Sequence, residues 1–477
     1  MKKALILVTV LLLLLTTLLA ACGDGNTESS EAVSGSSAES TEGSRGNDGS
    51  KSENDESKAE NNESKNENNE SKNENNDESS KSEQKEVAKL PTEYVEGGMN
   101  IELCSFTEEP YFALIGRCEN GATVTGEAGG EIVVSESYMG WYSLRLPCKE
   151  RTVDVKLSQS VNGKQVGETV EYTVKPATPG KDMWPVVTGG DFQFFFKKML
   201  PDFRGENLPN NASLNNLKGR TKNKLNQLRQ SNPDAEIIYM LVPSAMSVYP
   251  ELVPAQYKQA SGDTKYDLIA NALTEAGATV IDIKGAFEEH KNDEMPLYYK
   301  LDSHWSDYGA FVAYTELFNH IMKKFPEATA RPADDFDWNP DYYQSGDMSY
   351  YLAKNATEAV KNQQNIKEFS YFREFLSDVP DAVTKFDRYV SSSKLTYNDV
   401  MTYENYISTG NSKLPDCIVL RDSYSTQMYD ILAERMNNTH YYGMWNYTWD
   451  AQSIKSESPD YVIYIVAEWN LDSVLYN

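Results

Sequence analysis

Residues 23–90 contain no phenylalanine, tyrosine or tryptophan, and this composition limits where the chain can fold. They carry eighteen acidic and eight basic side chains, and the unit Glu56-Ser-Lys-Ala-Glu-Asn-Asn62 recurs over 63–69 and 70–76. A period of seven is also that of a coiled coil, but this repeat has no large apolar residue to form a seam. Because such a segment cannot bury enough surface to offset its ordering entropy, we expect residues 22–90 to be a disordered acidic tether.

The chain begins with a short apolar segment. Two lysines precede residues 4–19, which are almost wholly apolar, and small residues then lead to Cys22. A membrane-spanning anchor is the alternative, but sixteen apolar residues are few for one and no basic cluster follows. The run Leu19-Ala-Ala-Cys-Gly23 resembles a bacterial lipobox. That resemblance implies a lipoprotein signal peptide over 1–21, lipidation of Cys22 and attachment to the outer face of the cell membrane.

The overall composition excludes several classes of protein. A formal net charge of −27 argues against nucleic acid as a partner, because phosphates need a basic surface. Five cysteines in 477 residues are too few for a disulfide-stapled scaffold. With four histidines and no CxxC pair, the sequence indicates no structural zinc, and it predicts no metal and no cofactor.

Residues 91–178 have the pattern of a small all-β domain. Short runs of β-branched and aromatic residues alternate with turn signals, and Asn162-Gly163 is a strong hairpin signal. Six or seven strands in this length predict an immunoglobulin-like sandwich, acting as a spacer or a carbohydrate-contacting module. Two of its three cysteines could pair outside the cytosol. The predicted strands are Met99–Phe106, Tyr111–Cys118, Glu131–Ser135, Trp141–Leu146, Thr152–Leu157 and Glu168–Val174, and the cysteines are Cys104, Cys118 and Cys148.

Residues 181–477 alternate between short apolar runs and helical periodicity. Strands separated by helices predict an α/β domain with an open, mostly parallel sheet and helices on both faces. Reactive groups collect at the carboxyl ends of the strands in such sheets. The predicted strands are Glu236–Val242, Ala278–Ile283, Cys417–Leu420 and Tyr461–Val466, and the predicted helices are Leu214–Arg229, Tyr266–Ala276, Ala310–Phe325 and Thr426–Met436.

A first candidate site is Ser423, which follows a buried strand at the start of a helix. A serine at this junction can present its hydroxyl at the strand tip while its own N–H faces a bound oxyanion. A helix N-cap role for Ser423 or Ser425 is the common alternative.

A second candidate site is the pair Asp302 and His304, just before a long amphipathic helix. Side chains two apart in an extended segment share a face, so the carboxylate can orient the imidazole. A hydrogen-bonded structural histidine is the alternative, and a metal site would need a third ligand. His290, His320 and His440 have weaker contexts, in a charged run, a helix and a polar loop.

The two sites together supply the parts of nucleophilic catalysis. Ser423 is a weak nucleophile at neutral pH, so His304 would take its proton and Asp302 would stabilise the imidazolium. This interpretation predicts that loops 119 residues apart in the chain converge.

These residues resemble a known family. Asp302-Ser-His-Trp-Ser-Asp-Tyr-Gly-Ala310 is similar to the D-[TS]-H-W-[TS]-x-x-G-A motif of the SGNH hydrolase-like domain in bacterial alginate O-acetyltransferases, and to the DHHW relatives of many Gram-positive bacteria. Other segments resemble the family in the same order, over most of 185–470. They are Gly189–Phe196, Leu241–Glu251, Gly346-Asp-Met348 and Val419–Tyr424.

The resemblance implies an O-acetyltransferase that moves acetyl groups to a surface or secreted polysaccharide through an acetyl-serine, with Ser423 as nucleophile, His304 as base and Asp302 as orienter. It also implies a membrane-bound O-acyltransferase as acetyl supplier. A polysaccharide O-acetylesterase and a non-catalytic glycan-binding lipoprotein are the alternatives. The chain departs from the family pattern at Arg421 (usually glycine), at Ser244-Ala245 (often a lysine) and at Glu468-Trp-Asn470 (often Glu-Arg).

Overall fold

The computed structural model describes residues 94–477 except 109, 138–139, 178–185, 345, 349–366, 377–378 and 385–403. The expected signal peptide, Cys22 and the acidic tether lie outside the described residues. All described residues fall in one compact unit, so the boundary at 178–181 stays a prediction. Among the described helices, none combines the length and the apolar character that crossing a membrane requires.

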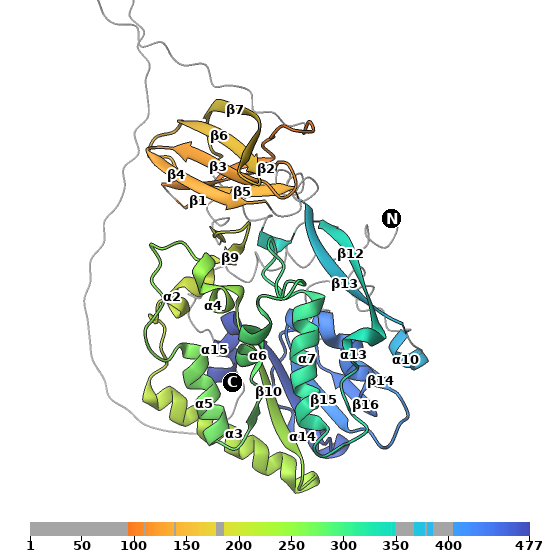
Figure 1. Cartoon of the computed structure of the whole chain (residues 1–477). Helices are drawn as coiled ribbons and strands as arrows, with labels where there is room; N and C mark the ends of the chain where they lie inside the picture. The colour runs from red at the N-terminus through yellow and green to blue at the C-terminus, as the bar shows by residue number, and fades with distance from the viewer. Residues whose placement is uncertain are drawn as a thin grey trace, which may run out of the picture. The chain divides into compact units, whose positions relative to one another are not determined.

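The first part of the described chain forms two antiparallel sheets (Figure 1). One has the order β1-β2-β5 and the other β4-β3-β6-β7. Their facing sides share one apolar core, and Gly126 shows how closely they pack, because a Cβ there would lie 2.6 Å from Leu144 Cδ1 of the other sheet. The strands are β1 (Leu103–Glu108), β2 (Tyr111–Arg117), β3 (Thr123–Ala128), β4 (Glu131–Glu136), β5 (Trp141–Pro147), β6 (Val153–Val161) and β7 (Lys164–Val174).

The sandwich predicted from the sequence is present, with one strand more than the pattern located. The additional strand β3 contains Gly126, which weakens the sequence signal of a strand. The turn between β6 and β7 is the predicted hairpin, with Asn162 at φ 51° and Gly163 at φ 73°. The order differs from that of constant immunoglobulin domains in that the fourth strand pairs with the third, so the immunoglobulin relationship stays a prediction. The three cysteines of this region are free thiols, so the considered pairing is absent.

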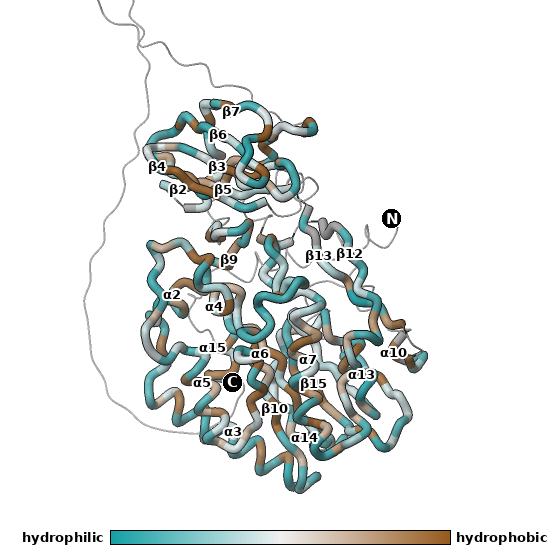
Figure 2. Tube along the Cα trace, viewed as in Figure 1, coloured by the Kyte–Doolittle hydropathy of each residue, from teal (hydrophilic) through white to brown (hydrophobic). Residues whose placement is uncertain are grey.

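The second part is built on a six-stranded sheet of order β11-β10-β17-β15-β16-β14, in which only the edge strand β14 is antiparallel. All seven residues of β17 are buried, as expected of a central parallel strand, and the sheet is apolar in Figure 2. The strands are β10 (Glu236–Val242), β11 (Thr279–Val280), β14 (Asn405–Ser408), β15 (Asp416–Arg421), β16 (Asn438–Tyr441) and β17 (Tyr461–Ala467).

Helices cover both faces of this sheet, because alternate strand residues point to opposite cores. Ile463 belongs to one core and Tyr464, the next residue, to the other. The first core includes α6 (Ile283–His290), α7 (Asp307–Ile321) and α13 (Tyr429–Glu434). The second includes α3 (Asn211–Ser231), α5 (Lys265–Glu275), α14 (Ala451–Glu457) and α15 (Leu471–Tyr476).

Shorter elements decorate this frame. Two antiparallel strand pairs lie outside the main sheet, β8 (Val186–Thr188) with β9 (Phe194–Phe196) and β12 (Phe336–Gln344) with β13 (Lys367–Phe375). The short helices are α2 (Leu200–Phe203), α4 (Ala245–Val248) and α10 (Asp381–Thr384), and the 3-10 turns are η1 (Lys197–Met199), η2 (Pro250–Leu252), η3 (Ala333–Asp335), η4 (Ser423–Met428) and η5 (Glu468–Asn470).

Three predictions from the sequence need correction. The predicted strand Ala278–Ile283 is only the two-residue β11, because Asp282 caps α6 by accepting the Gly285 N–H. The predicted helix Thr426–Met436 starts earlier as the 3-10 turn η4 and becomes α-helical only at Tyr429. His440 lies in β16 rather than in a polar loop.

Candidate active site

The carboxyl ends of three neighbouring parallel strands carry the candidate site. Ser423 comes two residues after β15, Trp469 two residues after β17 and Ser244 two residues after β10. This is the edge at which ligands bind in open α/β sheets. Asp302 and His304 reach the same edge from the loop that precedes α7.

The structure brings Ser423, His304 and Asp302 into one chain of hydrogen bonds. The Oγ atom of Ser423 lies 2.8 Å from His304 Nε2, and His304 Nδ1 lies 2.7 Å from Asp302 Oδ1. The same carboxylate oxygen accepts the His304 backbone N–H at 2.9 Å, which fixes the two-residue spacing seen in the sequence. The Asp302 side chain is 2% exposed and that of His304 is 19% exposed. The imidazole can therefore be reached from solvent, whereas the Asp302 carboxylate cannot.

Asp422 anchors the turn that presents the serine. Its buried carboxylate accepts hydrogen bonds from the Tyr424 N–H at 3.0 Å, the Tyr447 hydroxyl at 2.9 Å and the Ala467 N–H at 2.7 Å. Because the last donor ends β17, the bonds tie the serine turn to the neighbouring strand. Burial raises the pKa of Asp422, and these donors oppose the rise. Asp422 therefore acts as a structural N-cap, the role that the sequence offered for serine at this junction.

Arg421, where the family usually has glycine, is buried within the fold. Its Nε donates to the Tyr442 carbonyl at 3.0 Å, and its guanidinium lies over the rings of Tyr429 and Tyr441, 4.9 and 5.9 Å from their centroids. Through these contacts the Arg421 guanidinium links the end of β15 to the segments that follow it.

The electrostatics of the pair favour a charged imidazole and a charged carboxylate. Burial lowers the pKa of His304, but the charge and hydrogen bond of Asp302, followed by the charges of Asp347 and Asp422, raise it to about 9. Burial likewise raises the pKa of Asp302, and His304 outweighs this and holds it below the usual value. An imidazolium formed by proton transfer from Ser423 would therefore be stabilised here.

Asp347 is a third acidic residue at the site, and the sequence pattern assigned it no role. Its Oδ1 accepts the Ser303 N–H at 2.8 Å, and its ligand-type atoms lie within 4.8 Å of those of Asp302 and His304. The sequence supplied only two ligands for a cation, and the fold adds a third. These carboxylate oxygens already accept hydrogen bonds from Ser303 and from the backbone, so the group is satisfied as it stands.

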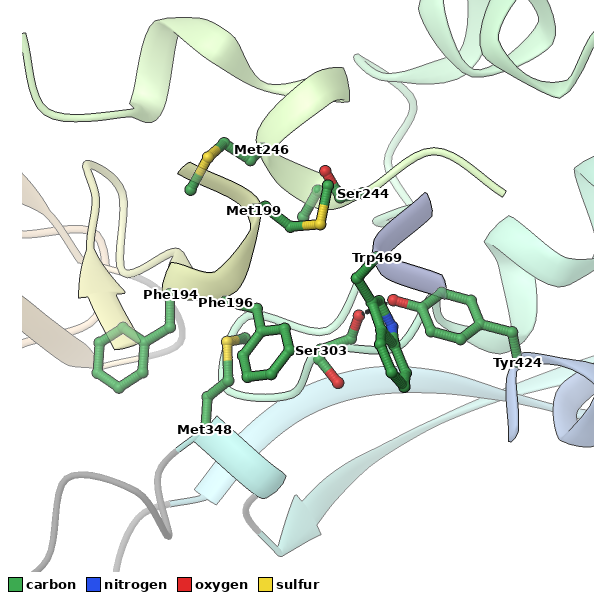
Figure 3. A pocket seen from close by; sticks show the side chains of 10 residues that line it. Phe194, Phe196, Met199, Ser244, Met246, Ser303, Met348, Tyr424 and Trp469 are labelled. Carbon is green, nitrogen blue, oxygen red and sulfur yellow. Dashed lines mark hydrogen bonds between the residues drawn. The ribbon is translucent and has the colours of Figure 1, made fainter. Parts of the chain in front are cut away.

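A small apolar pocket adjoins the site (Figure 3). Its free volume is about 10 Å³, room for about one water molecule, and both Ser303 and Tyr424, the chain neighbours of His304 and Ser423, line it. The Nε1 atom of Trp469 is buried and has no hydrogen-bond partner among the described residues. The other lining residues are Phe194, Phe196, Met199, Ser244, Ala245, Met246 and Met348.

The remaining histidines stay away from this chain of bonds, and each has its own acidic partner. His290 contacts Asp293 at 2.7 Å. His320 contacts Glu236 at 3.0 Å, and His440 contacts Glu457 at 2.9 Å.

A serine, a histidine and an aspartate in this order of contact, at the carboxyl edge of a parallel sheet, are the arrangement of nucleophilic acyl-transfer sites. Residues 203–375 match the family model of the SGNH hydrolase-like domain of the acetyltransferase AlgX. The match confirms the resemblance over these residues, which include Asp302 and His304 but not Ser423. The chain thus carries an SGNH hydrolase-like α/β region after a small all-β region.

The solved structures that the chain matches include the following three. The DHHW family protein of Eubacterium siraeum is 15% identical over 67% of this chain and 92% of its own, with a TM-score of 0.39. The O-acetyltransferase domain of Pseudomonas putida AlgJ is 16% identical over 63% and 94%, with a TM-score of 0.38. Bacillus cereus PatB1 with a sulfonyl adduct is 15% identical over 61% and 96%, with a TM-score of 0.43. A search of the curated proteins finds no match.

Proposed function

We propose that this protein is an O-acetyltransferase that uses Ser423 as its nucleophile and passes the acetyl group to hydroxyls of a polysaccharide. The observation that carries the proposal is the pair of contacts at His304, 2.8 Å from the Ser423 hydroxyl on one nitrogen and 2.7 Å from Asp302 on the other. The description of the matched family as an acetyltransferase domain supports the choice of acyl group.

The mechanism has two half-reactions with the same proton carrier. In the first, Ser423 Oγ attacks the acetyl carbonyl while His304 Nε2 takes the hydroxyl proton, and the proton then passes to the departing donor oxygen. In the second, a sugar hydroxyl gives its proton to His304 and attacks the acetyl-serine, and Ser423 leaves with that proton. Asp302 keeps Nδ1 protonated, so that Nε2 is free to accept.

We place the acetyl group at this pocket, whose free volume of about 10 Å³ means that its side chains must move apart to admit a methyl group. Its lining is apolar around a single unpaired donor, Trp469 Nε1. In the widened pocket a methyl group would contact Met199 and Met246, and the indole N–H, which is covered in the present structure, would donate to an ester oxygen. The Ser423 N–H is the second donor that we propose for the oxyanion, and one such donor contributes about 3 kcal/mol to transition-state stabilisation.

The cellular setting belongs to the same proposal. A lipid on Cys22 and an acidic tether over 22–90 would hold the enzyme at the outer face of the membrane, within reach of an acetyl-supplying membrane O-acyltransferase and of a surface glycan. Because the chain carries a net charge of −27, a neutral glycan is favoured over an acidic one.

Transfer and hydrolysis are separated by one experiment. The purified protein is incubated with p-nitrophenyl acetate, with and without an oligosaccharide acceptor, and the acetylated sugar and free acetate are measured. We expect acetylated sugar in the wild type and none with Ser423→Ala, which should keep its circular dichroism spectrum. Release of acetate only would identify an acetylesterase, and unchanged turnover by Ser423→Ala would remove the proposal.

A further inference from the structure

A segment distant in the chain packs its backbone against Asp302. Gly346 follows β12, and a Cβ built on it would lie 2.1 Å from Asp302 Cβ and 2.5 Å from Asp302 Oδ2. Any side chain at position 346 would therefore push this segment away from the carboxylate. The close approach puts the next residue, Asp347, beside the loop that carries His304.

Asp347 makes contacts on both sides of Asp302. Its backbone N–H donates to Asp302 Oδ2 at 3.3 Å, while Asp302 Oδ1 receives His304. Its carboxylate accepts the N–H of Ser303 at 2.8 Å and also the Ser303 hydroxyl. The segment Gly346-Asp347 is thus hydrogen-bonded to the turn Asp302-Ser303-His304 through Asp302 and Ser303. Both carboxylate oxygens of Asp302 have hydrogen-bond partners.

We propose that Asp347 is a positioning residue of this site, whose carboxylate fixes the Asp302-Ser303-His304 turn and places a second negative charge beside the imidazole. This inference rests on the proposed function only for the role of the His304 imidazole as a catalytic base. The placement of the charge itself stands on the contacts of Gly346 and Asp347.

The charges around the imidazole come from three parts of the chain. Asp302 is on the same loop, Asp347 follows β12 and Asp422 follows β15, while the ring of Tyr424 lies 4.8 Å from that of His304. Burial and the charge of Asp302 raise the pKa of Asp347 to about 7. Asp347 therefore gains its charge near neutral pH, and that charge favours the imidazolium.

The test measures the imidazole directly in the full chain. His304 is followed by NMR with labelled histidine, assigned through His304→Gln, while the pH is raised. Asp347→Asn keeps the size of the side chain and removes its charge, so we expect the pKa of His304 to fall by about 1. Asp293→Asn is the matched control, because it removes the acidic partner of His290 and should leave His304 unchanged.

An unchanged pKa of His304 in folded Asp347→Asn would overturn the proposal. If that variant does not fold, Ser303→Ala is used instead. Ser303→Ala removes one donor that favours ionised Asp347, so the pKa of His304 should fall in the same direction but by less. An unchanged pKa of His304 in Ser303→Ala would then overturn the proposal as well. Because the titration needs no turnover, its result is independent of whether Ser423 transfers acetyl groups.

Discussion

The indole N–H of Trp305 donates to the backbone carbonyl of Tyr424 at 2.7 Å. These residues are each one position after His304 and Ser423, so this bond runs beside the contact between base and nucleophile. On the other side, the Tyr424 hydroxyl donates to the Ser303 carbonyl. Two loops 119 residues apart are thus joined along three consecutive positions, and the imidazole is held between the two flanking bonds.

Trp305→Phe should weaken catalysis while keeping the fold. Phenylalanine retains most of the buried apolar surface but leaves the Tyr424 carbonyl without its donor, a loss of about 1 to 2 kcal/mol. If the bond aligns the two loops, kcat/KM for an acetyl ester should fall about tenfold or more. Trp449→Phe is the control, since its indole bonds Gln227 at the surface. Equal kcat/KM values in the two variants would contradict the alignment role.

Asp302→Asn should reduce kcat by about 10⁴-fold with little change in KM. The asparagine amide can stabilise the wrong imidazole tautomer, in which Nε2 carries the proton and cannot accept one from Ser423. A serine-directed sulfonyl fluoride should also label Asp302→Asn much more slowly than the wild type. Labelling at the wild-type rate would show that Asp302 does not orient the base.

The rate of acyl transfer should rise with pH. The base must be neutral to accept the Ser423 proton, and the pKa of His304 is raised to about 9 by Asp302 and its neighbours. We therefore expect kcat/KM of the free enzyme to increase from pH 6 toward about pH 9. Measurement over pH 5.5–10 with a non-titrating ester checks this, and a plateau already reached at pH 7 would contradict it.

Glu368→Gln should stabilise the protein above neutral pH. Burial raises the pKa of Glu368 to about 8, although its carboxylate accepts the N–H groups of Lys300 and Leu301. Between about 4.3 in the unfolded chain and this value, the folded chain binds one more proton, so the free energy of unfolding falls as pH rises. The glutamine removes this dependence. Urea unfolding at pH 5 and pH 9 measures it, and Glu374→Gln, exposed on the same strand, should behave like the wild type.

Trp469→Phe should lower turnover without lowering the melting temperature. The indole N–H is buried without a partner among the described residues, so its removal should leave the melting temperature equal or higher. If that N–H serves a bound ester, kcat/KM should fall by about tenfold or more. Unchanged kcat/KM with a higher melting temperature would show that the indole does not contact substrate.

Local patterns in the sequence located the elements that carry the site. The run Glu236–Val242 is β10 at both ends, and the apolar runs ending near Arg421 and Ala467 are β15 and β17. Such runs are readable because a buried parallel strand must be apolar on both faces. The motif around His304 was readable because its partner Asp302 lies only two residues away.

Other features depend on contacts between distant segments. Gly346-Asp347 reaches Asp302 only because the chain after β12 returns to this loop, and nothing next to it in sequence indicates a carboxylate at an imidazole. The burial of Arg421 beside the stacked rings of Tyr429 and Tyr441 is also a consequence of packing.

The amino-acid sequence alone predicts how the chain is divided. An acidic segment with few apolar residues to bury is followed by a region of short strands, and apolar strands separated by amphipathic helices come last. These are properties of neighbouring residues, and hydrophobic periodicity expresses them locally. The tertiary structure alone decided that Ser423 lies 2.8 Å from His304, that Asp347 bonds to the turn carrying His304, and that Trp469 lines a small pocket with its buried N–H unpartnered among the described residues. Distances between residues far apart in the chain follow from how the sheet orders its strands, and no local pattern carries that order.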